Sequence, residues 1–112
     1  MKQVFFVPER GDVVRVASPA RSGRERPMFR LLLVLSPRAY NSRVGLAVLC
    51  PITSRPKGYP FEALIPPGLP VRGAILADQA ESLDWRSRRA EPVCSLPPDV
   101  VDEVLGKLRS LL

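Results

Sequence analysis

The 112-residue sequence contains no histidine and only two cysteines, Cys50 and Cys94, with no CxxC spacing. The absence of histidine excludes Ser-His-Asp, Cys-His and paired-histidine mechanisms. Any proton transfer must therefore use Arg, Glu, Asp, Tyr, Lys, a backbone group or water. Structural zinc is not expected, because such sites cluster cysteine and histidine ligands, and neither a metal nor another cofactor is predicted. Both cysteines stand beside apolar residues and are predicted to be reduced core residues.

A long hydrophobic run is also missing. The first residues, MKQVFFVPERGD, hold too short an apolar stretch for a signal peptide or a membrane span. No membrane association is therefore predicted, and the cytoplasm is the expected location. The length fits a single domain over residues 1–112, in which residues 1–9 are expected to form an arm that is at most partly ordered.

Basic residues and prolines are abundant. Seventeen lysines and arginines stand against eleven aspartates and glutamates, which gives a net charge of +6. This balance favours a polyanionic partner, either nucleic acid or an acidic protein segment. The thirteen prolines exclude a helical bundle, because each proline removes an N–H donor and breaks a helix interior.

Short strands separated by sharp turns are predicted for most of the chain. Their apolar and β-branched runs cover residues 13–16, 31–35, 46–50, 61–65, 71–77, 80–85 and 90–94. Pro51 and Pro56 frame a loop after the run 46–50. Glu62 is expected to point outward, and Gly73 is expected to mark a bulge or a close backbone approach. One or two helical turns are expected over 37–43 with Ser36 as the N-cap. An amphipathic helix begins at Pro97 or Pro98. This pattern predicts a mainly β protein, a small and strongly bent barrel or half-barrel covered by the C-terminal helix.

Arg30 and Thr53 are the candidate reactive residues. Arg30 stands where a basic loop, residues 18–29, enters an apolar strand, and Thr53 follows the next one. An arginine can hold a phosphate bidentately, a hydroxyl can donate to a phosphate oxygen, and RNA supplies its own 2′-hydroxyl nucleophile. Each residue also has a structural interpretation, an edge-strand charge for Arg30 and a turn hydroxyl for Thr53. Glu25 is a candidate base or an ion-pair partner of Arg30.

Further candidates contact RNA without reacting with it. Arginine and lysine side chains hold phosphates, and tyrosines in polar loops stack on bases, whereas Trp85 is expected in the core. The candidates of these two kinds are Arg24, Arg26, Tyr40, Lys57, Tyr59, Arg86 and Arg88.

From about Gly11 to its C-terminus the chain resembles the MazF/PemK family of toxin endoribonucleases from toxin–antitoxin modules. Any single matching motif is weak, but their order and spacing together form a specific signal. The motifs are GDVV at Gly11, the GxE of Gly23 and Glu25, Arg30 before LLLVLSP, YN at Tyr40, CPIT around Thr53, KGYPFE from Lys57, LADQ from Leu76 and WRSR at Trp85.

The resemblance implies an SH3-like small barrel closed by a C-terminal helix, working as a homodimer. It implies metal-independent, sequence-selective cleavage of single-stranded RNA, which leaves a 2′,3′-cyclic phosphate or 3′-phosphate and a 5′-hydroxyl. The family's catalytic arginine and threonine fall on Arg30 and Thr53, and its loop glutamate falls on Glu25. Asn41 and Gln79, which end the YN and LADQ motifs, are expected to contact RNA. The expected protein partner is a MazE-like antitoxin whose acidic tail occupies the RNA groove.

One departure concerns the reactive arginine, which in the family usually precedes proline. Here Leu31 follows Arg30, while Arg26 and Pro27 stand just upstream; alignment with LLLVLSP favours Arg30. Two other functions suit such a fold. One is gyrase poisoning, as by CcdB-like proteins, although those end in Trp-Gly-Ile and this chain ends in Ser-Leu-Leu. The other is RNA binding without catalysis.

Overall fold

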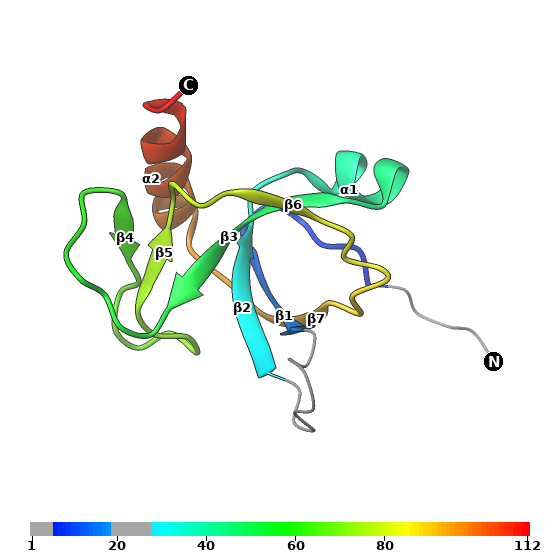
Figure 1. Ribbon diagram of the computed structural model, residues 1–112, viewed down its shortest axis with the longest axis horizontal. Helices are drawn as coiled ribbons and strands as arrows, with labels where there is room; N and C mark the ends of the chain where they lie inside the picture. Colours follow the sequence, from blue (N-terminus) through cyan, green and yellow to red (C-terminus); the bar gives the residue numbers. More distant parts are fainter. Residues whose placement is uncertain (1–5, 19–27) are drawn as a thin grey trace.

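The structure is a computed structural model that describes residues 6–18 and 28–112 (Figure 1). Short strands dominate it, and the longer helix stands at the C-terminal end. The elements are β1 (Asp12–Ser18), β2 (Met28–Val34), α1 (Arg38–Val44), β3 (Ala47–Thr53), β4 (Glu62–Leu64), β5 (Ala74–Leu76), β6 (Glu81–Leu83), β7 (Glu91–Ser95) and α2 (Pro98–Arg109).

All the strand pairs are antiparallel, in the order β4-β5-β3-β2-β1-β7, with β6 also paired to β3. Strand β3 is central, because β5 pairs with its C-terminal end and β6 with its N-terminal half. Helix α2 packs against β4, at the opposite end of the molecule from α1 (Figure 1). The predicted fold class is confirmed: a mainly antiparallel sheet with a C-terminal helix, bent into a small barrel-like shape that does not close.

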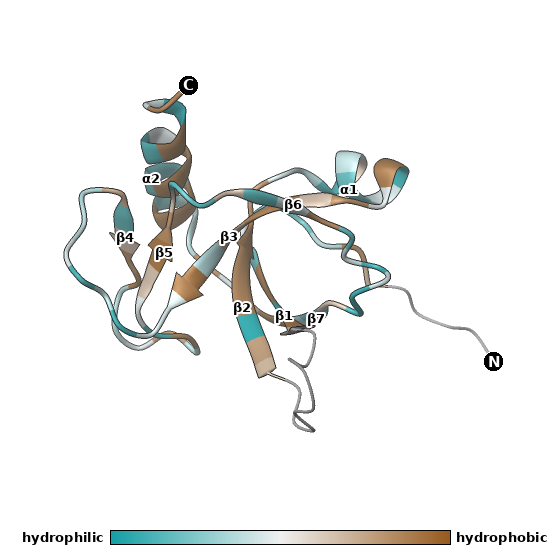
Figure 2. Ribbon diagram, in the orientation of Figure 1, coloured by the Kyte–Doolittle hydropathy of each residue, from teal (hydrophilic) through white to brown (hydrophobic). Residues whose placement is uncertain are grey.

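Two hydrophobic cores lie on opposite faces of β1, β2 and β3, which Figure 2 shows as largely hydrophobic strands. Side chains alternate between the faces of a strand, so neighbouring residues belong to different cores. The first core includes the apolar face of α2. Among its buried residues are Val13, Leu33, Cys50, Ile75, Val100, Val101 and Val104. The second core closes on the indole of Trp85: Val14, Val16, Leu32, Val34, Leu49, Leu83 and Trp85.

Strands β2 and β3 are both longer than predicted. β2 begins at Met28, so Arg30 lies inside the strand and not at its entrance. β3 continues through Pro51 to Thr53, where the sequence predicted a loop. Proline is tolerated there because Pro51 lies where the neighbour of β3 changes from β6 to β5, so its missing N–H interrupts neither ladder.

The two cysteines are free thiols, as predicted, and both pack in the first core. Cys50 is fully buried. Burial, together with the nearby carboxylates of Asp78 and Glu81, raises the pKa of the Cys50 thiol to about 12. Cys50 is therefore a protonated, inert packing residue at neutral pH.

Gly73 permits the close approach of β5 to the end of β3, as its place in the sequence suggested. Its φ is +114°, and a Cβ built on it would lie 1.8 Å from the carbonyl oxygen of Thr53. The next residue, Ala74, pairs with Thr53 across the two strands. Only glycine fits here, and through this contact it fixes the backbone that carries the Thr53 hydroxyl.

We therefore expect Gly73→Ala to destabilise the fold by about 3 kcal/mol or more, from left-handed strain together with overlap with a backbone carbonyl. Gly68→Ala is the matched control, since Gly68 has φ +91° but open space around it and should lose only about 1–2 kcal/mol. Urea unfolding at neutral pH measures both values. Equal losses in the two variants would show that the contact with Thr53 does not constrain β5.

Candidate functional site

Arg30 and Thr53 lie on adjacent strands and on the same face of the sheet. The register of β2 and β3 pairs Leu32 with Pro51, and two further residues along each strand reach Arg30 and Thr53. A step of two residues keeps a side chain on the same face. On its other side Arg30 pairs with Val16 of β1, whose side chain belongs to the second core. The two candidate residues therefore lie on the face of the sheet that carries the second core, and both are half-buried.

The oxygen of the Thr53 hydroxyl accepts one hydrogen bond, and its proton remains available for donation. Its Oγ1 accepts a hydrogen bond of 3.2 Å from the backbone N–H of Arg55. A hydroxyl has one proton and two lone pairs, so this bond orients the oxygen without using its O–H. The side chain is half-buried and can donate to an oxygen placed over the sheet.

The guanidinium of Arg30 forms an ion pair with Glu81, which the sequence analysis did not find. Arg30 Nη2 donates to Glu81 Oε2 at 2.8 Å, and the two side chains are 36% and 37% exposed. The sequence offered Glu25 as the ion-pair partner, but Glu25 lies outside the described residues. Glu81 is 51 residues from Arg30 in the chain, and no spacing rule connects the two positions.

A cleft of about 280 Å³ opens beside Arg30 at the ends of β2 and β3. Its lining combines two arginines with mostly apolar side chains, so it can hold an anion beside an apolar base. Arg72, which the sequence analysis did not single out, is the second of these. The lining residues are Phe29, Arg30, Leu31, Pro51, Ile52, Ser54 and Arg72.

A second cleft, of about 610 Å³, lies along β1 and the turn before β7. Arg88, which was predicted from the sequence to contact RNA, is one of the residues that line it. Arg15 stacks on the Phe29 ring at 4.8 Å. Phe29 is 55% exposed and lines both clefts, which makes them neighbours. Arg86, which was also predicted to contact phosphate, is exposed and stacks on the Trp85 ring at 5.0 Å. The second cleft is lined by Arg15, Ala17, Phe29, Ser87, Arg88, Arg89 and Glu91.

The turn that carries Lys57 and Tyr59 is held by Glu62, which was expected to point outward. Glu62 is buried, and its carboxylate accepts N–H bonds of 3.0 and 3.1 Å from Lys57 and one of 2.9 Å from Gly58. The outward prediction fails because these donors lie inside the loop. The Lys57 and Tyr59 side chains are exposed and remain available for RNA.

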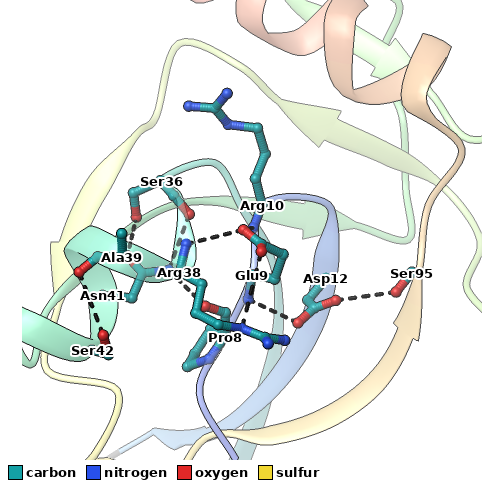
Figure 3. A network of polar contacts seen from close by, with 10 residues as sticks. All are labelled: Pro8, Glu9, Arg10, Asp12, Ser36, Arg38, Ala39, Asn41, Ser42 and Ser95. Atoms are coloured by element: carbon teal, nitrogen blue, oxygen red, sulfur yellow. Dashed lines mark hydrogen bonds and ion pairs between the residues drawn. The ribbon is translucent and has the colours of Figure 1, made fainter.

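Asn41 was predicted to contact RNA, and this prediction is wrong, because Asn41 is buried and its side chain is bonded inside the protein (Figure 3). Its Nδ2 donates to the carbonyls of Pro8 and Ser36 at 2.8 and 3.0 Å, and its Oδ1 accepts the Ser36 hydroxyl at 2.6 Å. Ser36 is therefore not the N-cap of α1, a position that Pro37 occupies. Pro8 is itself buried, so the expected arm is anchored at this residue.

The remaining candidates are separate from one another. Tyr40 lies exposed on α1, and Gln79 lies exposed in the turn before β6. Arg24 and Arg26, like Glu25, lie outside the described residues.

Within residues 6–18 and 28–112 no three His, Cys, Asp or Glu side chains gather closely enough to hold a metal ion. No helix in the described part of the chain is long and apolar enough to cross a membrane.

Comparisons with known proteins agree with one another. Residues 9–112 match the profile of the family described as PemK-like, MazF-like toxin of type II toxin–antitoxin system. The chain is 35% identical over 107 residues to the endoribonuclease toxin MazF of Escherichia coli K12, which covers 96% of each protein. A solved MazE–MazF complex from Deinococcus radiodurans matches with a TM-score of 0.90 at 51% identity, covering 96% of both chains. MazF alone from that organism matches with 0.84, at 51% identity over 96% of this chain and 97% of that one.

The turn held by Glu62 gives a pH-dependent prediction. The N–H groups of Lys57, and then of Gly58 and Tyr59, lower the pKa of the Glu62 carboxyl below its ordinary value of 4.5. A lowered folded-state pKa stabilises the fold above the ordinary value, and this contribution is lost as the pH falls through the folded-state value.

We expect Glu62→Gln to unfold at lower urea concentration than the parent protein at pH 7, and the gap to narrow as the pH falls below 4.5. Glu103→Gln is the control, because Glu103 makes a surface pair with Lys107 at 3.6 Å and should change stability by less than about 0.5 kcal/mol. A gap for Glu62→Gln that is constant from pH 7 to pH 3 would contradict this role.

Proposed function

The chain belongs to the family of PemK-like, MazF-like toxins of type II toxin–antitoxin systems, and we propose that it cleaves single-stranded RNA through Arg30 and Thr53 without a metal ion. The observation that carries this proposal is the register of β2 and β3, which sets the two side chains on one face of adjacent strands. A planar fork of donors and a hydroxyl proton converge there, which suits a phosphodiester group.

In the proposed reaction the 2′-oxygen of RNA forms a bond to the adjacent phosphorus, and the bond from phosphorus to the 5′-oxygen breaks. The products are a 2′,3′-cyclic phosphate and a 5′-hydroxyl. Negative charge grows on the non-bridging oxygens at the transition state. Arg30 and Thr53 donate hydrogen bonds to these oxygens, and preorganised donors of this kind supply most of the stabilisation in such reactions.

The proton of the 2′-hydroxyl needs an acceptor, and the chain has no histidine to provide one. We propose Glu25 for this role. Its sequence position allows two roles, ion-pair partner of Arg30 or base. Among the described residues Glu81 is the carboxylate that pairs with Arg30, which favours the second role for Glu25. The 5′-oxygen is protonated as it leaves, by water or by the acid form of the same group.

RNA lies along the basic side of the molecule in this proposal. Phosphates contact Lys57, Arg86 and Arg88, and we propose the same role for Arg24 and Arg26, which precede β2 in the sequence. Exposed Tyr40 and Tyr59 offer rings for base stacking, and Gln79 offers an amide for a base edge. Side chains at these loop positions select the sequence that is cut.

A MazE-like antitoxin and a second copy of the chain are the proposed protein partners. The net charge of +6 favours an acidic segment, and a basic cleft holds Arg15, Arg88 and Arg89. Association of two copies is supported by apolar side chains that remain in water, including Met28, Phe29 and Leu64. The molecule acts in the cytoplasm, where messenger RNA is translated. Gyrase poisoning, by contrast, gives Arg30 and Thr53 no role.

We expect purified protein to cleave single-stranded RNA in EDTA and the Arg30→Ala variant to lose activity by at least about 100-fold, the typical cost of one transition-state donor. Thr53→Val keeps the branched shape and removes the hydroxyl, so it should lose a similar factor, whereas Thr53→Ser should retain activity. Gel assays on a labelled oligonucleotide measure these rates.

Arg109→Ala, at the exposed end of α2, controls for the loss of one positive charge and should cleave at the parental rate. RNA that stays intact with the parent protein excludes the enzyme. Full activity in Arg30→Ala would instead show that cleavage uses other residues.

The proposed homodimer predicts a mass in light scattering of twice the 12.4 kDa chain at micromolar concentration. Leu64→Glu places a charge on the exposed apolar surface and tests whether that part belongs to the interface, in which case the mass falls towards that of one chain. A parent protein that scatters as a single chain would contradict the dimer.

A further inference from the structure

The ion pair of Arg30 and Glu81 joins three strands on one face of the sheet. Glu81 is the first residue of β6 and pairs with Leu49 of β3, whose side chain belongs to the second core. Arg30 comes from β2 on the other side of β3. The guanidinium and the carboxylate therefore meet over β3, on the same face as the Thr53 side chain.

This ion pair adds little to stability. Both side chains are more than one third exposed, and pairs of this kind contribute about 0–1 kcal/mol because water and salt screen them. The main effect of Glu81 is on the orientation of the Arg30 side chain. An arginine side chain carries about 2 kcal/mol of rotamer entropy, and the carboxylate restricts that freedom before any ligand arrives.

The geometry also leaves the arginine usable. The bond to Glu81 uses Nη2, which is one end of a planar group with five N–H donors. Donors on the remaining edges can reach a phosphate while Glu81 holds Nη2. A carboxylate fixed on the protein side of a guanidinium is the arrangement that orients an arginine towards an anion.

We propose that Glu81 is a positioning residue that holds Arg30 in the orientation required for phosphodiester cleavage. The inference rests on the proposed function, because it concerns the same arginine. Glu81 acts by accepting a hydrogen bond from Nη2, so its oxygen matters more than its charge. It does not contact the reacting phosphate.

Two substitutions separate the oxygen from the charge. Glu81→Ala removes the acceptor, and we expect kcat to fall about 10-fold, a modest value among the effects of misplaced catalytic groups. KM should not rise, because no group that binds RNA is lost. Glu81→Gln keeps an oxygen for Nη2 and should restore kcat to within about threefold of the parent protein, since the geometry is kept.

Glu103→Ala is the matched control. Glu103 pairs with Lys107 at 3.6 Å on the surface of α2, and neither residue lines the two clefts, so its removal takes away a paired carboxylate that the reaction does not use. Its kcat should equal that of the parent. Urea unfolding of the variants should give midpoints close to that of the parent protein, because exposed ion pairs contribute little to stability.

A double-mutant cycle with Arg30→Ala under single-turnover conditions completes the test. Glu81→Ala should have no further effect once Arg30 is absent. Unchanged or faster cleavage by Glu81→Ala overturns the proposal. So does a Glu81→Gln variant as slow as Glu81→Ala, which would show that the charge of the carboxylate matters and that an acceptor oxygen alone is not enough. Failure of the proposed function gives a different result in the same assay, because the parent protein itself then leaves RNA intact.

Discussion

The pairing of β2 with β3 is the constraint on which the rest of the molecule depends. Both strands are buried on two faces, so a slip of one residue would move every side chain to the wrong core. That double burial, with Leu32 in one core and Leu33 in the other, fixes the register strongly. Thr53 ends β3 and Arg30 lies near the start of β2. Both residues are half-buried, and their alignment follows from packing several residues away.

Backbone geometry and charge then refine the site in different ways. Gly73 lets β5 approach Thr53 so closely that any side chain would collide with its carbonyl, and this fixes where the hydroxyl stands. The orientation of Arg30 is set by a carboxylate from β6, so its fork is partly ordered before RNA binds. Neither device uses a histidine or a metal ligand. In the proposed reaction the site supplies fixed donors for a growing negative charge.

Much of the fold could be predicted because local patterns carry it. The run Leu31–Leu35 reports burial on both faces, and the spacing of Val100, Val101 and Val104 reports α2. Strand ends were less visible: Pro51 predicted a stop, yet it lies at a change of strand partner where its missing N–H is tolerated. Leu31, where the family usually has proline, pairs with Arg15 as an ordinary strand residue.

The site was only partly predictable for a physical reason. Motif order made Arg30 and Thr53 the candidate reactive residues. A motif does not report burial, however, so Asn41 was taken for an RNA contact although its amide binds Pro8 and Ser36. Glu62 was misjudged in the same way, because its donors come from a turn whose path the sequence does not specify. Glu81 escaped notice because its contact with Arg30 depends on how β6 returns to β3.

The most direct test of the central claim is cleavage of two RNA oligonucleotides that differ in one atom group, a 2′-hydroxyl or a 2′-O-methyl at the scissile nucleotide. The position is first mapped from the 5′ ends of the products. We expect the hydroxyl substrate to be cut in EDTA to a 2′,3′-cyclic phosphate and the methylated one to remain whole. Cleavage of the methylated RNA at the same position would show that the nucleophile is not the RNA's own hydroxyl and would contradict this account.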